Sequence, residues 1–149
     1  MDMMKQISIW LMGTLLLATT YPAGAQQQTK IHRIGYLSIQ SLSAMADRIE
    51  AFRQGLRELG YMEGKTIVIE WRYGEEKPDR VSELAAGLAH LKVDVIVSGG
   101  NSATQAAKKA TNSIPIVMTR ASDPVASEFI ASLARPSGNI TGLSALRRN

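Results

Sequence analysis

The 149-residue chain contains no cysteine, two histidines and few aromatic residues, which make up 5% of it. Without cysteine the chain can form no disulfide framework, and it offers no thiol to carry a lipid anchor. His32 and His90 lie far apart and belong to no cluster with the spacing of metal ligands, so we predict no metal site. The chain is long enough for one domain with a real hydrophobic core, and too short for two.

The sequence also lacks the motifs of common enzyme classes. Residues 100–104 begin like a nucleophile elbow, but Thr104 stands where that motif needs a glycine. Residues 98–101 complete neither a dinucleotide fingerprint nor a phosphate-binding loop. A phosphate-receiver domain would need acids after the first and third strands, where this chain has Ser38 and Ser98. We therefore predict that the protein is not an enzyme and binds no cofactor.

The charge of the chain is nearly balanced, since 17 basic and 13 acidic residues give a formal net charge of +4. The basic residues are scattered, and Arg147 and Arg148 at the end form the one clear pair. A nucleic-acid-binding protein would gather its basic residues in a patch or run. We predict no nucleic-acid partner.

The first 25 residues have the order of a secretory signal peptide. Lys5 precedes an apolar run at 7–18, and small residues end the segment at Ala25. The apolar run is too short for a membrane span, which needs about 20 residues. We predict cleavage after Ala25, a flexible lead over residues 26–32, and a periplasmic protein without a lipid anchor.

After this lead, short β-rich runs alternate with longer segments of helical period. The pattern predicts an α/β fold: an open parallel sheet in the order 2-1-3-4-5 with helices on both faces, joined by right-handed crossovers. The expected strands are 33–38, 66–73, 93–98, 114–118 and 140–144. The expected helices are 44–59, 79–91, 102–110 and one that starts near Pro124.

The first expected helix shows why the pattern indicates helices. Its apolar residues recur at spacings of three and four, which predicts one buried stripe: Met45, Ile49, Phe52, Leu56 and Leu59. Ser41 or Ser43 can cap its start, and Gly60 stands where a C-terminal glycine ends a helix.

A ligand site is expected beyond the carboxyl ends of the strands, beside the point where strand order reverses. The loops that follow strands one, three and four meet there and run into helix N-termini, which favour a carboxylate or another anion. We predict these ligand-binding residues: Ser38, Gln40, Gly99, Gly100, Asn101, Ser102, Ser122 and Asp123. Asp123 would receive an ammonium group, and few aromatic residues are expected near the crevice.

Five of these eight residues also have an explanation without a ligand. Asp123, Asn101 or Ser102 would serve equally well as a helix N-cap. The pair of glycines at 99 and 100 would suit a tight turn or a close approach of backbones.

Several runs, in this order and spacing, resemble one family over residues 34–148. The runs are 34–38, 52–61 with 63–64, 70–73, 94–97, 106–111, 114–117, 123–125 and 132–136 with 138–142. They resemble the periplasmic substrate-binding proteins of ABC transporters that include the tryptophan and tyrosine transport type. The resemblance implies one lobe of a type I periplasmic-binding-protein fold.

The resemblance further implies a function and a domain division. The protein would bind a small polar, amino-acid-like solute, aromatic ones included, and deliver it to an ABC permease in the inner membrane. Residues 33–137 would form the ligand-binding lobe, and 138–149 would begin the crossing to a second lobe that this chain does not contain. The alternatives are an exported sensing or interaction module, or a truncated half without function. An exported hydrolase or isomerase would need Asp123 with Ser38 or Ser102, but no base is positioned for it.

Overall fold

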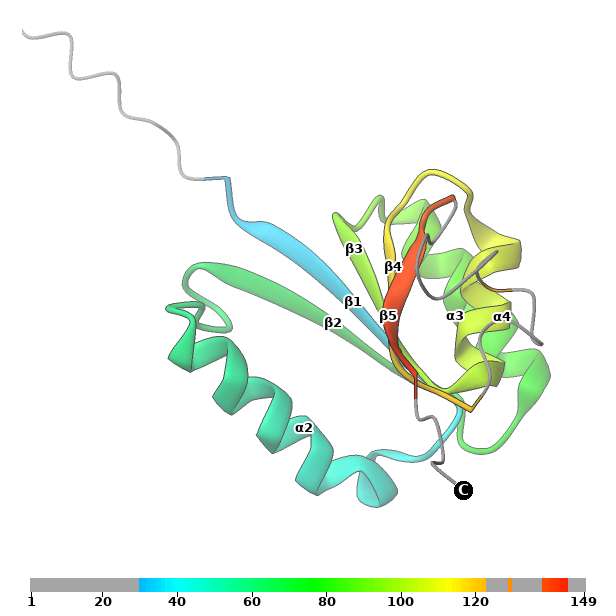
Figure 1. Cartoon of the computed structure of the whole chain (residues 1–149), viewed down its shortest axis with the longest axis horizontal. Coiled ribbons are helices and arrows are strands. Elements are labelled where there is room, and N and C mark those ends of the chain that lie inside the picture. Colours follow the sequence, from blue (N-terminus) through cyan, green and yellow to red (C-terminus); the bar gives the residue numbers. More distant parts are fainter. Residues whose placement is uncertain (1–29, 123–128, 130–137, 145–149) are drawn as a thin grey trace, which may run out of the picture.

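The computed structural model describes residues 30–122, 129 and 138–144, which form one five-stranded parallel sheet with helices on both faces (Figure 1). The strands are β1 (His32–Ser38), β2 (Ile67–Tyr73), β3 (Val95–Gly99), β4 (Ile116–Ala121) and β5 (Ile140–Ser144). The helices are α2 (Leu42–Glu58), α3 (Pro78–His90) and α4 (Asn101–Ala110). The strand order β2-β1-β3-β4-β5 confirms the predicted order. The helix expected from Pro124 lies outside the described residues.

The sheet separates two hydrophobic clusters. On one face α2 lies along β1 and β2, and on the other face α3 and α4 lie side by side (Figure 1). The cluster under α2 contains Tyr36, Met45, Ile49, Ile67, Ile69 and Val97. The cluster under α3 and α4 is larger and includes Leu37, Val81, Leu88, Ile96, Ile116 and Met118. Among the described helices, none is long and apolar enough to cross a membrane.

The ends of α2 follow from its sequence. The Oγ atom of Ser41 accepts a hydrogen bond from the amide of Ala44 at 3.3 Å, so Ser41 is the N-cap. Gly60 has a φ of +86°, and the amides of Gly60 and Tyr61 reach back to the last turn, which ends the helix in a Schellman motif. The prediction that Leu59 is buried is wrong: it is 75% exposed, because the helix ends at Glu58 and the chain turns away from the sheet.

Helix α3 approaches β1 closely because Gly35 has no side chain. Leu88 is fully buried between α3 and the sheet. A Cβ atom at Gly35 would lie 2.9 Å from its Cδ2 atom. Glycine at this position therefore sets the distance between the helix and the strand.

Strand β4 differs most from its predicted bounds. It starts at Ile116, after Pro115, and continues to Ala121, three residues past the predicted end at Met118. The extension pairs with β5 beyond an irregularity in register between Met118 and Ala121. This extension contains polar residues, so the hydrophobic pattern did not predict that the strand continues. They are compatible with it because Thr119 and Arg120 lie on an open part of the sheet.

The start of β2 is tied to α2 by one carboxylate. The Oε2 atom of Glu63 accepts a hydrogen bond from Nε of Arg53, and Oε1 accepts one from Nε1 of Trp71, both at 2.7 Å. The guanidinium of Arg53 also lies over the Trp71 ring, 4.9 Å from its centroid. Partial burial raises the pKa of Glu63, but the two hydrogen bonds and the charge of Arg53 outweigh it and hold that pKa below its usual range.

We expect Glu63→Gln to lower the free energy of unfolding by about 0.5–1 kcal/mol at pH 7, since the pair is partly exposed and screened. A lowered folded-state pKa gives stability that is present at neutral pH and lost as pH falls through that pKa. The native chain should therefore lose more stability than the variant between about pH 5 and pH 3, as measured by urea unfolding. Glu83→Gln, at an exposed position of α3, is the control and should change neither quantity.

Candidate functional site

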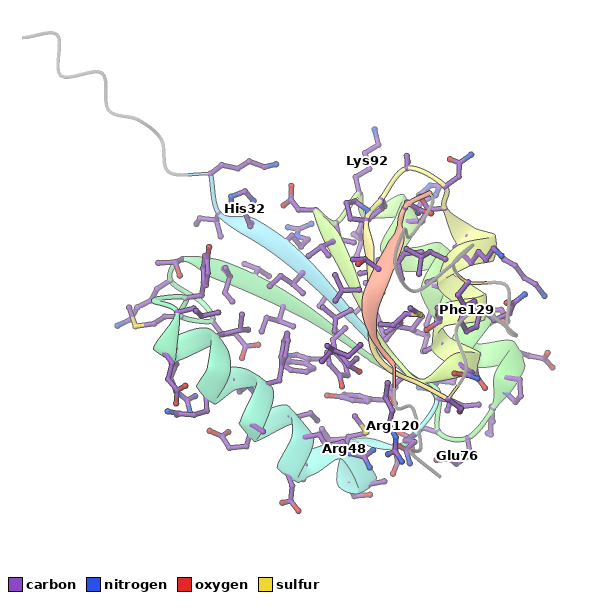
Figure 2. The ribbon with its side chains drawn as sticks, viewed as in Figure 1. His32, Arg48, Glu76, Lys92, Arg120 and Phe129 are labelled. Atoms are coloured by element: carbon purple, nitrogen blue, oxygen red, sulfur yellow. The ribbon has the colours of Figure 1, made fainter. Side chains whose placement is uncertain are left out.

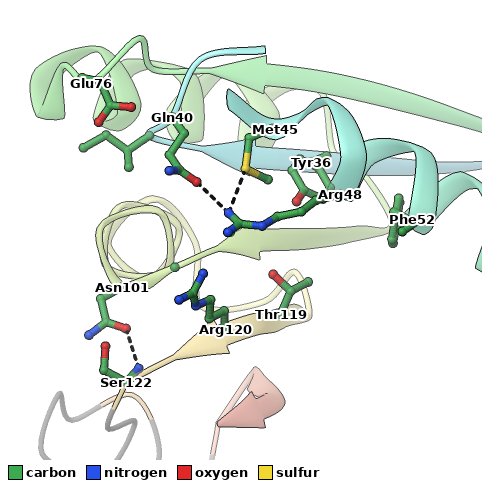
Figure 3. A pocket seen from close by; sticks show the side chains of 14 residues that line it. Tyr36, Gln40, Met45, Arg48, Phe52, Glu76, Asn101, Thr119, Arg120 and Ser122 are labelled. Carbon is green, nitrogen blue, oxygen red and sulfur yellow. Dashed lines mark hydrogen bonds between the residues drawn. The ribbon is translucent and has the colours of Figure 1, made fainter. Parts of the chain in front are cut away.

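A pocket of about 700 Å³ lies at the carboxyl ends of β1, β3 and β4, where the order of strands reverses (Figure 3). One wall comes from the first half of α2, and the other from the ends of β3 and β4. The volume lies within the range of about 300–1,000 Å³ that is usual for small-molecule sites. The position agrees with the crevice expected from the sequence, because the carboxyl ends of parallel strands share one edge.

The structure brings five of the eight predicted ligand residues to this pocket: Gln40, Gly99, Gly100, Asn101 and Ser122. Ser38 does not line it. That side chain is fully buried, and its Oγ atom accepts a hydrogen bond from the amide of Gln40 at 3.1 Å. Ser102 is exposed on α4 away from the pocket lining, and Asp123 lies outside the described residues. The binding role of all eight stays a prediction.

The loop from β3 into α4 is shaped by Gly100. Its φ of +98° belongs to the left-handed region that favours glycine, although the space around it is open. Gly100 is the N-cap of α4, and no side chain caps that helix. The capping explanation for Asn101 and Ser102 is therefore not supported by the structure.

A short chain of hydroxyl groups holds this loop from below. Ser98 and Thr104 share a buried hydrogen bond of 2.8 Å, and Thr104 donates to the carbonyl of Gly100 at 2.9 Å. Thr119 donates to the carbonyl of Ser98 at 3.2 Å, which joins β4 to β3. These bonds fix the glycine loop relative to both strands that contribute to the pocket.

The pocket is also lined by two arginines that were not among the predicted ligand residues. Nη1 of Arg48, on α2, donates to Oε1 of Gln40 at 2.9 Å and lies 3.5 Å from the sulfur of Met45. Arg120 comes from the last part of β4. Figure 3 shows its guanidinium pointing toward that of Arg48 across the pocket.

Two aromatic residues stand at the crevice, where the sequence predicted few. Tyr36 and Phe52 line the pocket, and their ring centroids are 5.5 Å apart. Trp71 packs behind both rings and stacks on Tyr73. Burial raises the pKa of the Tyr36 phenol, and the nearby charge of Arg48 partly opposes that rise. The phenol is therefore neutral and can serve as a hydrogen-bond donor at physiological pH.

Glu76 is the acid that the described lining contains. It lies in the turn between β2 and α3, where Glu75 and Glu76 have φ values of +51° and +59°. This left-handed conformation costs a non-glycine residue about 1–2 kcal/mol. The amide of Glu76 donates to the carbonyl of Ile39 at 2.7 Å, and that of Gly74 donates to Ser38 at 2.8 Å. These bonds hold the strained turn against the end of β1.

The missed residues left only a weak signal in the sequence. Phe52 was assigned to the buried stripe of its helix, which is correct, but that stripe also reaches the pocket. Arg48 follows Met45 by about one turn, and no motif in the sequence marks it as a pocket residue. Within the described residues, no group of three or more acids and histidines could hold a metal ion.

Comparisons with known proteins agree on one family. Over residues 33–148 the sequence matches the family model described as ABC transporter substrate binding protein. A tyrosine-binding protein from Clostridioides difficile (strain R20291) is 33% identical over 95 residues, which are 64% of this chain and 28% of that protein.

Two solved structures resemble the fold. One is the ligand-free, open structure of a substrate-binding protein with adhesive properties from Clostridium difficile (TM-score 0.72, 29% identity), with 76% of this chain and 39% of that chain covered. The other is an ABC domain in complex with L-Trp from Streptococcus pneumoniae (TM-score 0.71, 26% identity), with 76% and 38% covered. The chain therefore spans 28% to 39% of the length of these relatives.

Proposed function

Because the chain belongs to the family of ABC transporter substrate-binding proteins, we propose that it is the solute-binding component of an importer. Its sheet has the fold of one lobe of a periplasmic binding protein. The solute would be small, polar and amino-acid-like. The relatives named for tyrosine and solved with L-Trp favour an aromatic amino acid. An ABC permease in the inner membrane would receive it.

The observation that carries this proposal is the composition of the pocket. Arginine, glutamine, asparagine and hydroxyl groups stand beside the rings of Tyr36 and Phe52 in one cavity. Polar groups of this kind bind a carboxylate or an amine, and the aromatic wall packs against an apolar side chain. No nucleophile and base are arranged together at this site in the described residues, which favours binding over catalysis.

The proposal includes a location and a division of the chain. Residues 1–25 would direct export and be removed, and 26–32 would form a short lead. Residues 33–137 would be the binding lobe, and 138–149 would start the crossing to a second lobe. Strand β5 lies in the same sheet as β4, so this crossing would leave directly from the edge of the sheet. A second lobe would close over the exposed side of the pocket by a hinge motion.

A thermal-shift screen of the chain against the common amino acids tests the proposal. A solute that binds only the native state stabilises it by about 2.7 kcal/mol at a concentration of 100 times its Kd. We expect an aromatic amino acid to raise the melting temperature. If no amino acid and no other small polar solute raises it, the proposed function is wrong. A permease and an ATPase gene beside this one would support import, whereas a histidine kinase gene would favour sensing.

We expect Ala51→Trp to weaken solute binding at least about tenfold, a loss of about 1.4 kcal/mol. Ala51 lines the pocket from an exposed position on α2, so an indole there fills the cavity without entering the core. Ala46→Trp is the matched control, because Ala46 is exposed on the same helix outside the pocket lining. Titration calorimetry should show lost affinity for Ala51→Trp alone. Equal affinity of both variants would place the solute elsewhere.

A further inference from the structure

The charge of the pocket is unbalanced. Three charged residues are among those that line it: Arg48, Arg120 and Glu76. Two positive charges and one negative charge leave the described lining with an excess of one positive charge. Glu76 does not neutralise either arginine, since no ion pair joins it to them. Figure 3 shows Gln40 between Glu76 and Arg48.

The arginines outside the pocket differ from this pair because several of them form ion pairs. Four of them contact a carboxylate within 4 Å: Arg33, Arg53, Arg57 and Arg72. In the described part of the chain, the hydrogen bonds of the Arg48 guanidinium go to the neutral groups of Gln40 and Met45, which hold it in position without cancelling its charge. Within the described residues, the side chain of Arg120 forms no hydrogen bond or ion pair.

The two guanidinium groups converge on the same space. Arg48 reaches it from α2, Arg120 reaches it from β4, and Figures 2 and 3 show both at the same end of the sheet. Two like charges that face one another destabilise the pocket when it is empty. An anion placed between them relieves that repulsion and accepts hydrogen bonds from both planar groups.

An apolar wall begins directly beside the arginine pair. Tyr36, Met45 and Phe52 line the pocket next to Arg48. The phenol of Tyr36 lies close enough to Arg48 for that positive charge to lower the pKa of the phenol. A solute whose carboxylate sits at the arginines would therefore place a neighbouring ring against Tyr36 and Phe52.

On the premise of the proposed solute-binding function, we propose that the solute is an aromatic amino acid or a related aromatic carboxylate, bound through its carboxylate by Arg48 and Arg120. In the part of the chain that the structure describes, no carboxylate stands beside the arginines to receive an α-amino group, so we expect that group to add little to binding. The described lining offers an ammonium group one carboxylate, Glu76, on the far side of Gln40. An ammonium group near the arginines would instead be repelled by them.

A matched series of three solutes tests this assignment by calorimetry: 3-phenylpropanoate, L-phenylalanine and phenethylamine carry the same ring with the acid, both groups, or the amine. We expect 3-phenylpropanoate to bind at least as tightly as L-phenylalanine. Phenethylamine should bind at least about tenfold more weakly than either. The affinity for 3-phenylpropanoate should fall as salt is added, since the interaction is electrostatic.

Variants identify the residues that bind the carboxylate. Arg48→Gln and Arg120→Gln should each weaken 3-phenylpropanoate at least about tenfold and leave phenethylamine unchanged or bound more tightly. Arg80→Gln is the control. Arg80 is an exposed arginine on α3 that does not line the pocket. All three positions are exposed, so no variant should melt far below the native chain. Arg48→Gln and Arg120→Gln each remove one of the two facing charges, so they should melt at the native temperature or slightly above it.

The outcomes separate this assignment from the proposed function. If L-phenylalanine binds about tenfold more tightly than 3-phenylpropanoate, or if both arginine variants keep full affinity, the arginine assignment is wrong and the solute-binding function stands. If neither acids nor amino acids bind, the proposed function is wrong and the assignment falls with it.

Discussion

Gly142→Ala is expected to lower the free energy of unfolding by about 3 kcal/mol or more. Gly142 pairs with Met118 across β4 and β5 and has a φ of +140°. A Cβ atom there would lie 2.1 Å from the Met118 carbonyl oxygen and 2.5 Å from its nitrogen. Backbone atoms cannot rotate away as a side chain can, so the two strands must separate.

Two other glycines separate the causes of this loss. Gly60→Ala keeps a positive φ of +86° but adds its methyl group in open space, so it should cost about 1 kcal/mol. Gly55→Ala, inside α2 and also in open space, should stabilise the chain by up to about 1 kcal/mol. The melting temperature should be lowest for Gly142→Ala, higher for Gly60→Ala and highest for Gly55→Ala. A melting temperature for Gly142→Ala equal to that of Gly60→Ala would mean that the strands yield without cost.

Leu88→Ala is expected to cost about 2–5 kcal/mol, because Leu88 is fully buried and its removal leaves a cavity between α3 and the sheet. Gly35→Ala alone should cost about 1–3 kcal/mol, since its methyl group would press on the end of that leucine. In the double variant the methyl group enters the vacated space. The double variant should therefore lose less stability than the sum of the two single losses, by about 1 kcal/mol or more.

Urea unfolding of all four proteins measures this coupling. The pair lies in the cluster under α3 and α4, on the side of the sheet away from the aromatic wall. The folded double variant should therefore bind solute with the same affinity as the native chain. Strict additivity would show that Leu88 and Gly35 do not share the space that their positions indicate.

The architecture was open to prediction because its signals are local and repeated. The helical stripe of α2, the cap at Ser41 and the stop at Gly60 each follow from spacing within one segment. Sheet order followed from the alternation of strands and helices, and the pocket edge followed from the sheet order. Element ends were less certain, since the register irregularity that lengthens β4 has no mark in the hydrophobic pattern.

The walls of the pocket were harder to predict than its position. Four consecutive residues at the end of β1 are buried, so alternation could not tell that Tyr36 faces the pocket and Leu37 the opposite core. Arg48 looked like an ordinary surface residue because helical period separates buried from exposed faces, and the pocket opens at the border between them. Such a border depends on where α2 lies over the sheet, which no short segment encodes.

The aromatic wall belongs to two parts of the molecule at once. Tyr36 is 3% exposed and packs with Phe52 and Trp71 in the cluster under α2, and it also lines the pocket. Any change of these rings alters stability together with recognition. The pocket is also lined by polar residues that do not belong to this hydrophobic cluster: Gln40, Arg48 and Arg120. Substitutions at these polar positions should therefore change the pocket without a loss of stability, whereas substitutions of the rings should change both.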